Sequence, residues 1–226
     1  MTESMTQSDV QKTIKALKSN RFDPVEYAAT AEEAAKIVFG MIPPDAKVGM
    51  GGSTSLMQLG VVEELVKKGQ MTLQKPDIYL TSSNAITENG KLVNTDMTGN
   101  RVSAMIFGPK QVIVVAGINK IVKDLDAAFD RIKGITAPAM AKIGGLKTPC
   151  AVEGGKCNDC NSSMRVCAVT TIIESKPRVT QISVVLVGED IGLGWEADWP
   201  DDRKKEINAV FRKNIARLRE TIQSIR

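Results

Sequence analysis

Apolar residues recur at helical spacing within the first twenty residues of the chain. Val10, Ile14 and Leu17 are separated by four and three positions, which places them on one face of a helix. Ser8 and Gln11 have the spacing of a capping box, in which side chains satisfy the free N–H groups at a helix start. The pattern therefore predicts a short amphipathic helix that begins near Ser8.

Four later segments also have the apolar spacing or the composition of helices. They are residues 31–41, 56–68, 123–133 and about 201–225. The first is expected to end before Pro43, because proline cannot continue a helix. The last carries apolar residues at three-, four- and seven-residue intervals, so one face should pack against this domain or a second subunit.

Short runs rich in β-branched residues alternate with these helices, which is typical of buried strands in an α/β fold. They are residues 46–50, 78–81, 111–116, 169–174 and 182–187, with a further extended piece at 24–28. Asn89 and Gly90 lie between two more short segments, and Asn-Gly is the strongest two-residue signal for a hairpin. The pattern predicts a mixed sheet with antiparallel strands at one side.

The composition is that of an ordinary globular chain. The 226 residues are 42% hydrophobic and 25% charged, and no repeat, low-complexity tract or long linker divides them. We therefore expect a single domain over residues 1–226. No apolar run approaches the roughly 20 residues that span a bilayer, and the polar start lacks the features of a signal peptide. These observations predict a cytoplasmic protein without membrane insertion.

Two shortages narrow the possible chemistry. The chain contains no histidine, which excludes Ser-His-Asp and Cys-His catalytic units and every His-ligated metal. Aromatic residues make up only 4%, which excludes a nucleic-acid surface built on a row of stacked rings. The net charge of +4 arises entirely within residues 201–226, which carry eight basic and four acidic side chains. No broad basic surface remains, so we expect no nucleic-acid partner.

Four cysteines are crowded into 18 consecutive residues. They are Cys150, Cys157, Cys160 and Cys167. The two-residue gap at the centre lets two thiolates face one metal, and the outer pair could complete a tetrahedral set. Four thiolate ligands suit zinc or an iron-sulfur cluster of the 4Fe-4S type. Free thiols and a redox-switched disulfide are the alternatives.

A second feature follows the strand predicted over residues 46–50. The sequence VGMGGSTS places two glycines and three hydroxyl side chains between that strand and the next helix. Glycines let a backbone approach a ligand closely, and the free N–H groups of a helix start attract anions. The motif lacks the lysine of a nucleotide P-loop. We expect Gly51, Gly52, Ser53, Thr54 and Ser55 either to bind an anionic group or to form only a tight connection.

The segment around the predicted hairpin is rich in amides and carboxylates. Glu88 precedes the turn, and Asn84, Asn94, Asp96 and Arg101 lie nearby in the sequence. If it is held near an anion-binding loop, Glu88 could act as a nucleophile or general base, with Asn84 binding the ligand. Ordinary turn chemistry also explains Asn, Glu and Gly beside a hairpin, so both interpretations stand.

Together these stretches resemble the LUD-domain family, which is named for lactate utilization. The similarity is carried by NAITENG, GNRV and CNDC and extends from about residue 8 to about residue 195. It implies the fold shared by ribose-5-phosphate isomerase and CoA transferases, a Rossmann-like open, mostly parallel sheet with an antiparallel hairpin portion and helices on both faces. Within that fold group, VGMGGSTS resembles the sugar-phosphate loop of the isomerases, and TENG resembles the segment that carries the catalytic Glu of some CoA transferases.

The resemblance and the residues lead to three expectations about function. The first is a protein of lactate or other carboxylate metabolism, with a cleft for a small anionic substrate and a four-cysteine metal or iron-sulfur centre. Electrons removed in the oxidation of lactate would pass to that cluster or to iron-sulfur partner subunits, because the chain has no dinucleotide fingerprint. The second is an enzyme that acts on CoA thioesters or sugar phosphates through Glu88. The third is a non-catalytic accessory subunit with a structural metal site, and a homo-oligomer is compatible with each.

Overall fold

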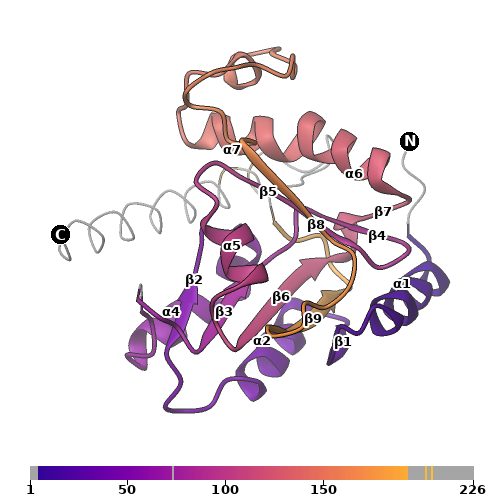
Figure 1. The fold of residues 1–226 in the computed structure, drawn as a ribbon, viewed down its shortest axis with the longest axis vertical. Coiled ribbons are helices and arrows are strands. Elements are labelled where there is room, and N and C mark those ends of the chain that lie inside the picture. The colour runs from indigo at the N-terminus through magenta and orange to yellow at the C-terminus, as the bar shows by residue number, and fades with distance from the viewer. Residues whose placement is uncertain (1–4, 73, 193–201, 203–204, 206–226) are drawn as a thin grey trace.

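A five-stranded parallel sheet forms the centre of the molecule (Figure 1). The computed structural model describes residues 5–72, 74–192, 202 and 205. The strand order is β1-β9-β6-β3-β2, and every neighbouring pair runs parallel. The strands are β1 (Val25–Ala28), β2 (Val48–Met50), β3 (Ile78–Thr81), β6 (Gln111–Gly117) and β9 (Gln181–Val187). The predicted strands at residues 24–28, 46–50, 78–81, 111–116 and 182–187 therefore form this sheet, whereas the run at 169–174 forms a strand of a second sheet.

A second, four-stranded sheet has the order β7-β4-β5-β8. Its strands are β4 (Ala85–Thr87), β5 (Leu92–Asp96), β7 (Ile121–Val122) and β8 (Val169–Ile173). β5 runs antiparallel to both β4 and β8, whereas β7 runs parallel to β4. The expected hairpin is confirmed as β4 and β5. It lies in this separate sheet and not at the side of the parallel one, because the chain leaves the first sheet between Thr81 and Ala85.

Helices cover both faces of the parallel sheet, so the α/β class is confirmed. One face packs against α2 (Ala31–Gly40), α3 (Thr54–Gln58) and α4 (Val61–Lys67) through Ile113 and Val115 of β6. The other face, with Val112 and Val114, packs against α1 (Gln7–Ser19), α5 (Asn100–Ile106) and the second sheet. Burial on both faces explains why these strands are continuous apolar runs without polar alternation.

A further helical layer covers the outer face of the second sheet (Figure 1). It consists of α6 (Leu125–Arg131), one π-helical turn (Ile132–Thr136) and α7 (Ala137–Ile143). Ala128 and Ile132 pack there against Ala85 and Val93 of the hairpin. Short 3-10 turns at Ile118–Lys120 and Pro149–Ala151 complete the described elements. The second sheet is thus enclosed between the parallel sheet and α6.

Two helices differ from the sequence prediction, and a third lies outside the described residues. The cap of α1 is Thr6, whose hydroxyl accepts a hydrogen bond from the Asp9 N–H at 3.3 Å, so the capping box predicted from Ser8 was wrong. The Asp9 carboxylate in turn accepts a hydrogen bond from the Thr6 N–H. The capping box therefore starts at Thr6, two residues before Ser8. The helix predicted over 56–68 is divided at Gly60, where φ is +69°. The helix expected at about 201–225 lies outside the described residues, apart from Asp202 and Lys205.

None of the helices in the part of the chain that the structure describes has the length and apolar composition needed to cross a bilayer.

The hairpin turn shows why glycine is needed at position 90. Gly90 has φ of +79°, a left-handed conformation that costs other residues about 1–2 kcal/mol. A Cβ added there would lie 2.6 Å from the backbone carbon of Ala16, because the turn packs directly on α1. The Asn20 side chain donates to the carbonyl oxygens of Asn89 and Gly90, both at 2.9 Å. These contacts join the hairpin to the end of α1.

We predict that Gly90→Ala lowers the free energy of unfolding by about 2–4 kcal/mol, because backbone strain and the Ala16 clash add together. Gly60→Ala is the matched control, since Gly60 also has positive φ but a Cβ there meets nothing within 4 Å. It should cost only about 1 kcal/mol. Urea unfolding followed by circular dichroism measures both. Equal losses in the two variants would contradict the packing argument.

Candidate functional site

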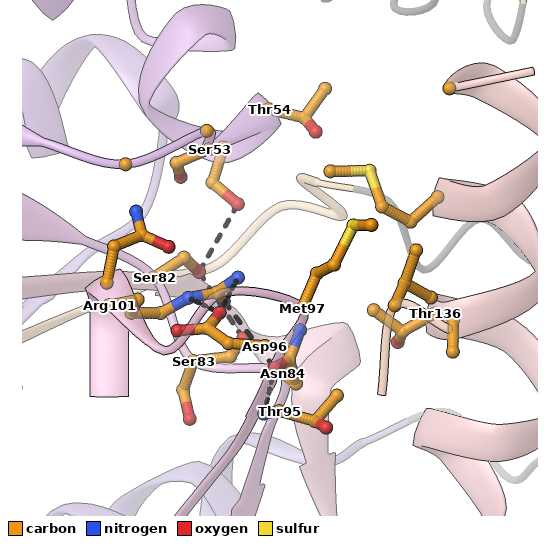
Figure 2. Close-up of a pocket in the computed structure, with 18 of the residues that line it drawn as sticks. Ser53, Thr54, Ser82, Ser83, Asn84, Thr95, Asp96, Met97, Arg101 and Thr136 are labelled. Atoms are coloured by element: carbon orange, nitrogen blue, oxygen red, sulfur yellow. Dashed lines mark hydrogen bonds and ion pairs between the residues drawn. The ribbon is translucent and has the colours of Figure 1, made fainter. Parts of the chain in front are cut away.

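A cavity of about 280 Å³ opens at the carboxyl ends of three neighbouring strands of the parallel sheet. Residues 51–55 follow β2, residues 82–84 follow β3, and Lys120 follows β6. The opposite wall comes from residues 95–98 of β5 and its loop, and from the α6–α7 layer. Figure 2 shows Thr136 across the cavity from Ser53. Carboxyl ends of parallel strands are the usual ligand position in α/β sheets.

The structure brings the expected binding residues together at this cavity. They are Gly51, Gly52, Ser53, Thr54, Ser55 and Asn84, and all six contribute to its lining. The glycine loop and the hairpin segment are about thirty residues apart in sequence and meet because β2 and β3 are adjacent and parallel. Their role in binding stays a prediction.

Glu88 does not lie with these residues. It is exposed in the turn after β4, and its N–H donates to the Val122 carbonyl oxygen at 2.8 Å. Residues 82–84, which precede β4, line the cavity, and Glu88 follows the other end of that strand. A nucleophilic carboxylate must reach about 3–3.5 Å from the reacting carbon. The expectation that Glu88 faces the same cleft as residues 51–55 is therefore corrected.

Close packing requires glycine in the first part of the loop. A Cβ on Gly51 would lie 2.8 Å from the Tyr79 hydroxyl oxygen and 3.1 Å from Nδ2 of Asn100. Burial raises the pKa of Tyr79 to about 12, so its hydroxyl stays protonated beside the loop. Thr54 is also buried, and its hydroxyl has no hydrogen-bond partner among the described residues. A buried hydroxyl without a partner is costly, and a bound ligand would relieve that cost.

The Asn84 side chain and backbone hold the opposite side of the cavity together. Its Oδ1 accepts from the Thr95 N–H at 2.8 Å and from Nη1 of Arg101 at 3.5 Å. Its own N–H donates to Oδ1 of Asn94 at 3.2 Å. Its carbonyl oxygen accepts from Nη1 of Arg131 at 3.1 Å. Asn84 therefore has a structural role in addition to its place in the cavity wall.

Asp96 and Arg101 form a short ion pair at the cavity. Oδ1 of Asp96 lies 3.0 Å from Nη2 and 3.1 Å from Nε of Arg101, and Oδ2 accepts from the Val102 N–H at 2.9 Å. The Asp96 side chain is 5% exposed and that of Arg101 is 17% exposed. Figure 2 shows the pair beside Asn84. The sequence analysis noted both residues but assigned them no role.

Lys120 is the most unusual residue of the site, and sequence reasoning missed it. Its Nζ donates to the Ser82 and Ser55 hydroxyl oxygens at 2.7 and 2.8 Å. Complete burial, followed by the charges of Arg131 and Arg101, holds the pKa of Lys120 well below its usual range. Within residues 5–72 and 74–192, no carboxylate forms an ion pair with it. Its position just after a predicted parallel strand was the available signal.

Arg131 was also missed, because its sequence context is an ordinary helix end. It is 7% exposed at the last position of α6, and besides Asn84 it donates to the Asn119 carbonyl oxygen and the Thr136 hydroxyl. Among the described residues, the cavity lining thus holds three basic side chains, those of Arg101, Lys120 and Arg131, and one carboxylate, that of Asp96. This imbalance favours an anionic ligand.

The cysteines lie in the loop that follows α7, beside the cavity. All four are partly exposed free thiols. Leu146 and Val166 of this loop line the cavity, but the cysteines do not. Arg165 donates to the Cys160 and Cys167 carbonyl oxygens and pairs with Asp159 at 2.7 Å. Cys167 and the Asp159 carboxylate raise the pKa of the Arg165 guanidinium.

The cysteine arrangement does not fit a metal as it stands. No group of three or more His, Cys, Asp or Glu side chains in the described part of the chain is placed to hold an ion. A zinc ion or cluster would require the loop to draw the four sulfur atoms together, since co-ligands of one metal each lie about 2.3 Å from it. Metal binding by Cys150, Cys157, Cys160 and Cys167 therefore stays a prediction from the sequence.

The chain is similar to known proteins through a protein family and a solved structure. A family model described as the LUD domain matches residues 70–187, about half of the chain. Among solved structures, a DUF162 family protein from Deinococcus radiodurans is similar, with 12% sequence identity and a TM-score of 0.49. The similarity covers 80% of this chain and 96% of that one. No curated protein matches the chain at a significant level.

We predict that Asp96→Asn lowers the free energy of unfolding by about 2–4 kcal/mol. The change removes the partner charge of Arg101 and turns a carboxylate oxygen, which accepts from Val102, into a group that can be a donor. Glu32→Gln is the control, because Glu32 pairs with Lys36 on an exposed helix surface and should leave stability unchanged. Urea unfolding measures both. A neutral effect of Asp96→Asn would show that the pair does not support the fold.

Proposed function

Because the chain belongs to the LUD-domain family, we propose that it serves carboxylate metabolism and that its cavity binds the small anionic substrate. Lactate is the substrate to which the family name points. The observation that carries this proposal is that Arg101, Lys120 and Arg131 line the cavity, while Asp96 is the one carboxylate among its described lining residues. Arginine keeps its charge in such a place, and the Lys120 amine can donate hydrogen bonds in either protonation state, so these groups suit an anion.

Two further observations agree with a small polar ligand. The cavity volume of about 280 Å³ is near the lower end for ligand sites, which suits a molecule of a few heavy atoms. The buried Thr54 hydroxyl lacks a partner among the described residues, and a carboxylate or hydroxyl group of a ligand could supply one. A 2-hydroxy acid carries both groups. The apolar side of the cavity, with Met97, Met140 and Leu146, would accept a short carbon chain.

The two alternatives from the sequence differ in what they require of this cavity. An enzyme acting on CoA thioesters or sugar phosphates would also bind an anion here, but Glu88 is not placed to act on it. An accessory subunit with a structural metal would need the cysteine loop to close around an ion and would need no ligand in the cavity. Measurements of ligand binding and metal content therefore distinguish the proposed function from these two alternatives.

We predict that a small 2-hydroxy acid such as L-lactate raises the melting temperature of the protein. At 100 times its dissociation constant it should stabilise the fold by ~2.7 kcal/mol, or about 5–10 °C for a chain of this size. Arg131→Met should remove most of this shift, whereas Arg178→Met, which neutralises an exposed arginine, should not. Each variant is compared with its own ligand-free melt, so a lower starting stability does not obscure the result. Equal shifts in both variants, or no shift with any carboxylate or phosphate, would refute the proposal.

We also propose a test of the four-cysteine centre. Protein purified without oxygen is analysed for zinc, iron and acid-labile sulfide, and its thiols are titrated with a disulfide reagent. Stoichiometric metal with protected thiols is expected for a zinc or iron-sulfur site, because bound thiolates react slowly. Four freely reactive thiols without metal would show that the partly exposed cysteines of the structure are the native state. Cys160→Ser is the variant that should release the metal.

A further inference from the structure

A hydrogen-bonded cluster of Ser55, Ser82 and Lys120 lies in the cavity wall. Anion binding alone does not require this arrangement. Nζ of Lys120 lies 2.7 Å from the Ser82 hydroxyl oxygen and 2.8 Å from that of Ser55, and the two hydroxyl oxygens are 3.4 Å apart. We propose that Ser82 is a catalytic nucleophile with Lys120 as its general base, and that the reaction is acyl transfer from a small anionic ester or thioester. The inference rests on the proposed function only for the binding of the substrate's anionic group.

The environment of Lys120 favours the neutral amine, which is the form that can accept a proton. The side chain is buried, and among the described residues no carboxylate forms an ion pair with it that would stabilise an ammonium ion. Arg131 and Arg101 add repulsion between like charges. A nucleophile within hydrogen-bond reach of a base, with a third group that orients the base, is the usual arrangement for activating a hydroxyl. Ser55 is that third group.

The surroundings of the two hydroxyls assign their roles. The backbone of Gly192 covers Ser55, because a Cβ at Gly192 would lie 2.7 Å from the Ser55 hydroxyl oxygen and 2.6 Å from Nζ of Lys120. Ser55 is 1% exposed, while Ser82 is 5% exposed and comes directly from the end of β3. Figure 2 shows Ser82 among the residues that line the cavity. Ser82 is therefore the hydroxyl that a substrate carbonyl can reach, and Ser55 positions the amine.

The chemical step uses only these groups, the substrate and water. The Ser82 hydroxyl gives its proton to Nζ of Lys120 while its oxygen bonds to the acyl carbon. The bond from that carbon to the leaving alcohol or thiol then breaks, and the Lys120 ammonium returns the proton to the leaving group. Water, or a second acceptor, releases the acyl group from Ser82 by the same sequence, with Lys120 again as base. No oxidation or reduction takes place.

The test uses the full chain and a small alkyl fluorophosphonate, which forms a phosphorus–oxygen bond to an activated serine and releases fluoride. Mass spectrometry should show one adduct per chain, located on Ser82. Ser82→Ala should abolish it, and Lys120→Met should slow its formation at least 100-fold, the usual contribution of a general base. Ser19→Ala, which removes an exposed hydroxyl at the end of α1, should leave the rate unchanged. Thermal melts confirm that each variant is folded.

The pH dependence supplies a readout that a structural role of Lys120 would not change. The labelling rate should rise with pH as the Lys120 ammonium loses its proton and reach a plateau once the amine is neutral, and Lys120→Met should lack this rise. An adduct on Ser55 would reverse the assigned roles, and so overturn the proposal. Absence of any serine adduct, while lactate still raises the melting temperature, would refute acyl transfer and leave the proposed function standing. An adduct without carboxylate binding would refute the proposed function alone.

Discussion

The hydrogen bonds of Asn84 are the interaction on which the site depends most. Asn84 lies where the chain passes from the parallel sheet into the second sheet, between β3 and β4. Its amide and backbone connect β5, Arg101 of α5 and Arg131 of α6. Because the groups involved are buried, each of these bonds must be made or its desolvation remains uncompensated. One residue thereby fixes how the two sheets meet and where two basic side chains lie.

The electrostatics of the cavity are a consequence of that junction. Arg131 is held by carbonyl oxygens of Asn84 and Asn119 and by the Thr136 hydroxyl, all of which are neutral acceptors. Lys120 is held by two serine hydroxyls in the same way. A bound anion, as proposed above, would accept further hydrogen bonds from these basic groups and so stabilise the folded protein.

The cysteine loop belongs to the same region although it supplies no sulfur to the cavity. Leu146 and Val166 form part of the wall, and Asp159 pairs with Lys133 of the π-helical turn at 3.5 Å. A rearrangement that gathered the four sulfur atoms would move these wall residues. If the cysteines bind a metal and the cavity binds a ligand, as proposed, the loop would therefore connect the two sites.

The amino-acid sequence by itself determined most of the strands and helices and singled out the glycine-rich loop at residues 51–55. Continuous apolar runs such as 78–81 and 182–187 are strands because both of their faces are buried, and the Asn89-Gly90 turn follows from the backbone freedom of glycine. These signals are local, so they can be recognised without knowledge of the fold. Tertiary structure alone decided that Glu88 is exposed outside the cavity lining and that Lys120, Ser55 and Ser82 meet within it. Those residues are far apart in the chain, and only the parallel pairing of β2, β3 and β6 brings their carboxyl ends to one edge.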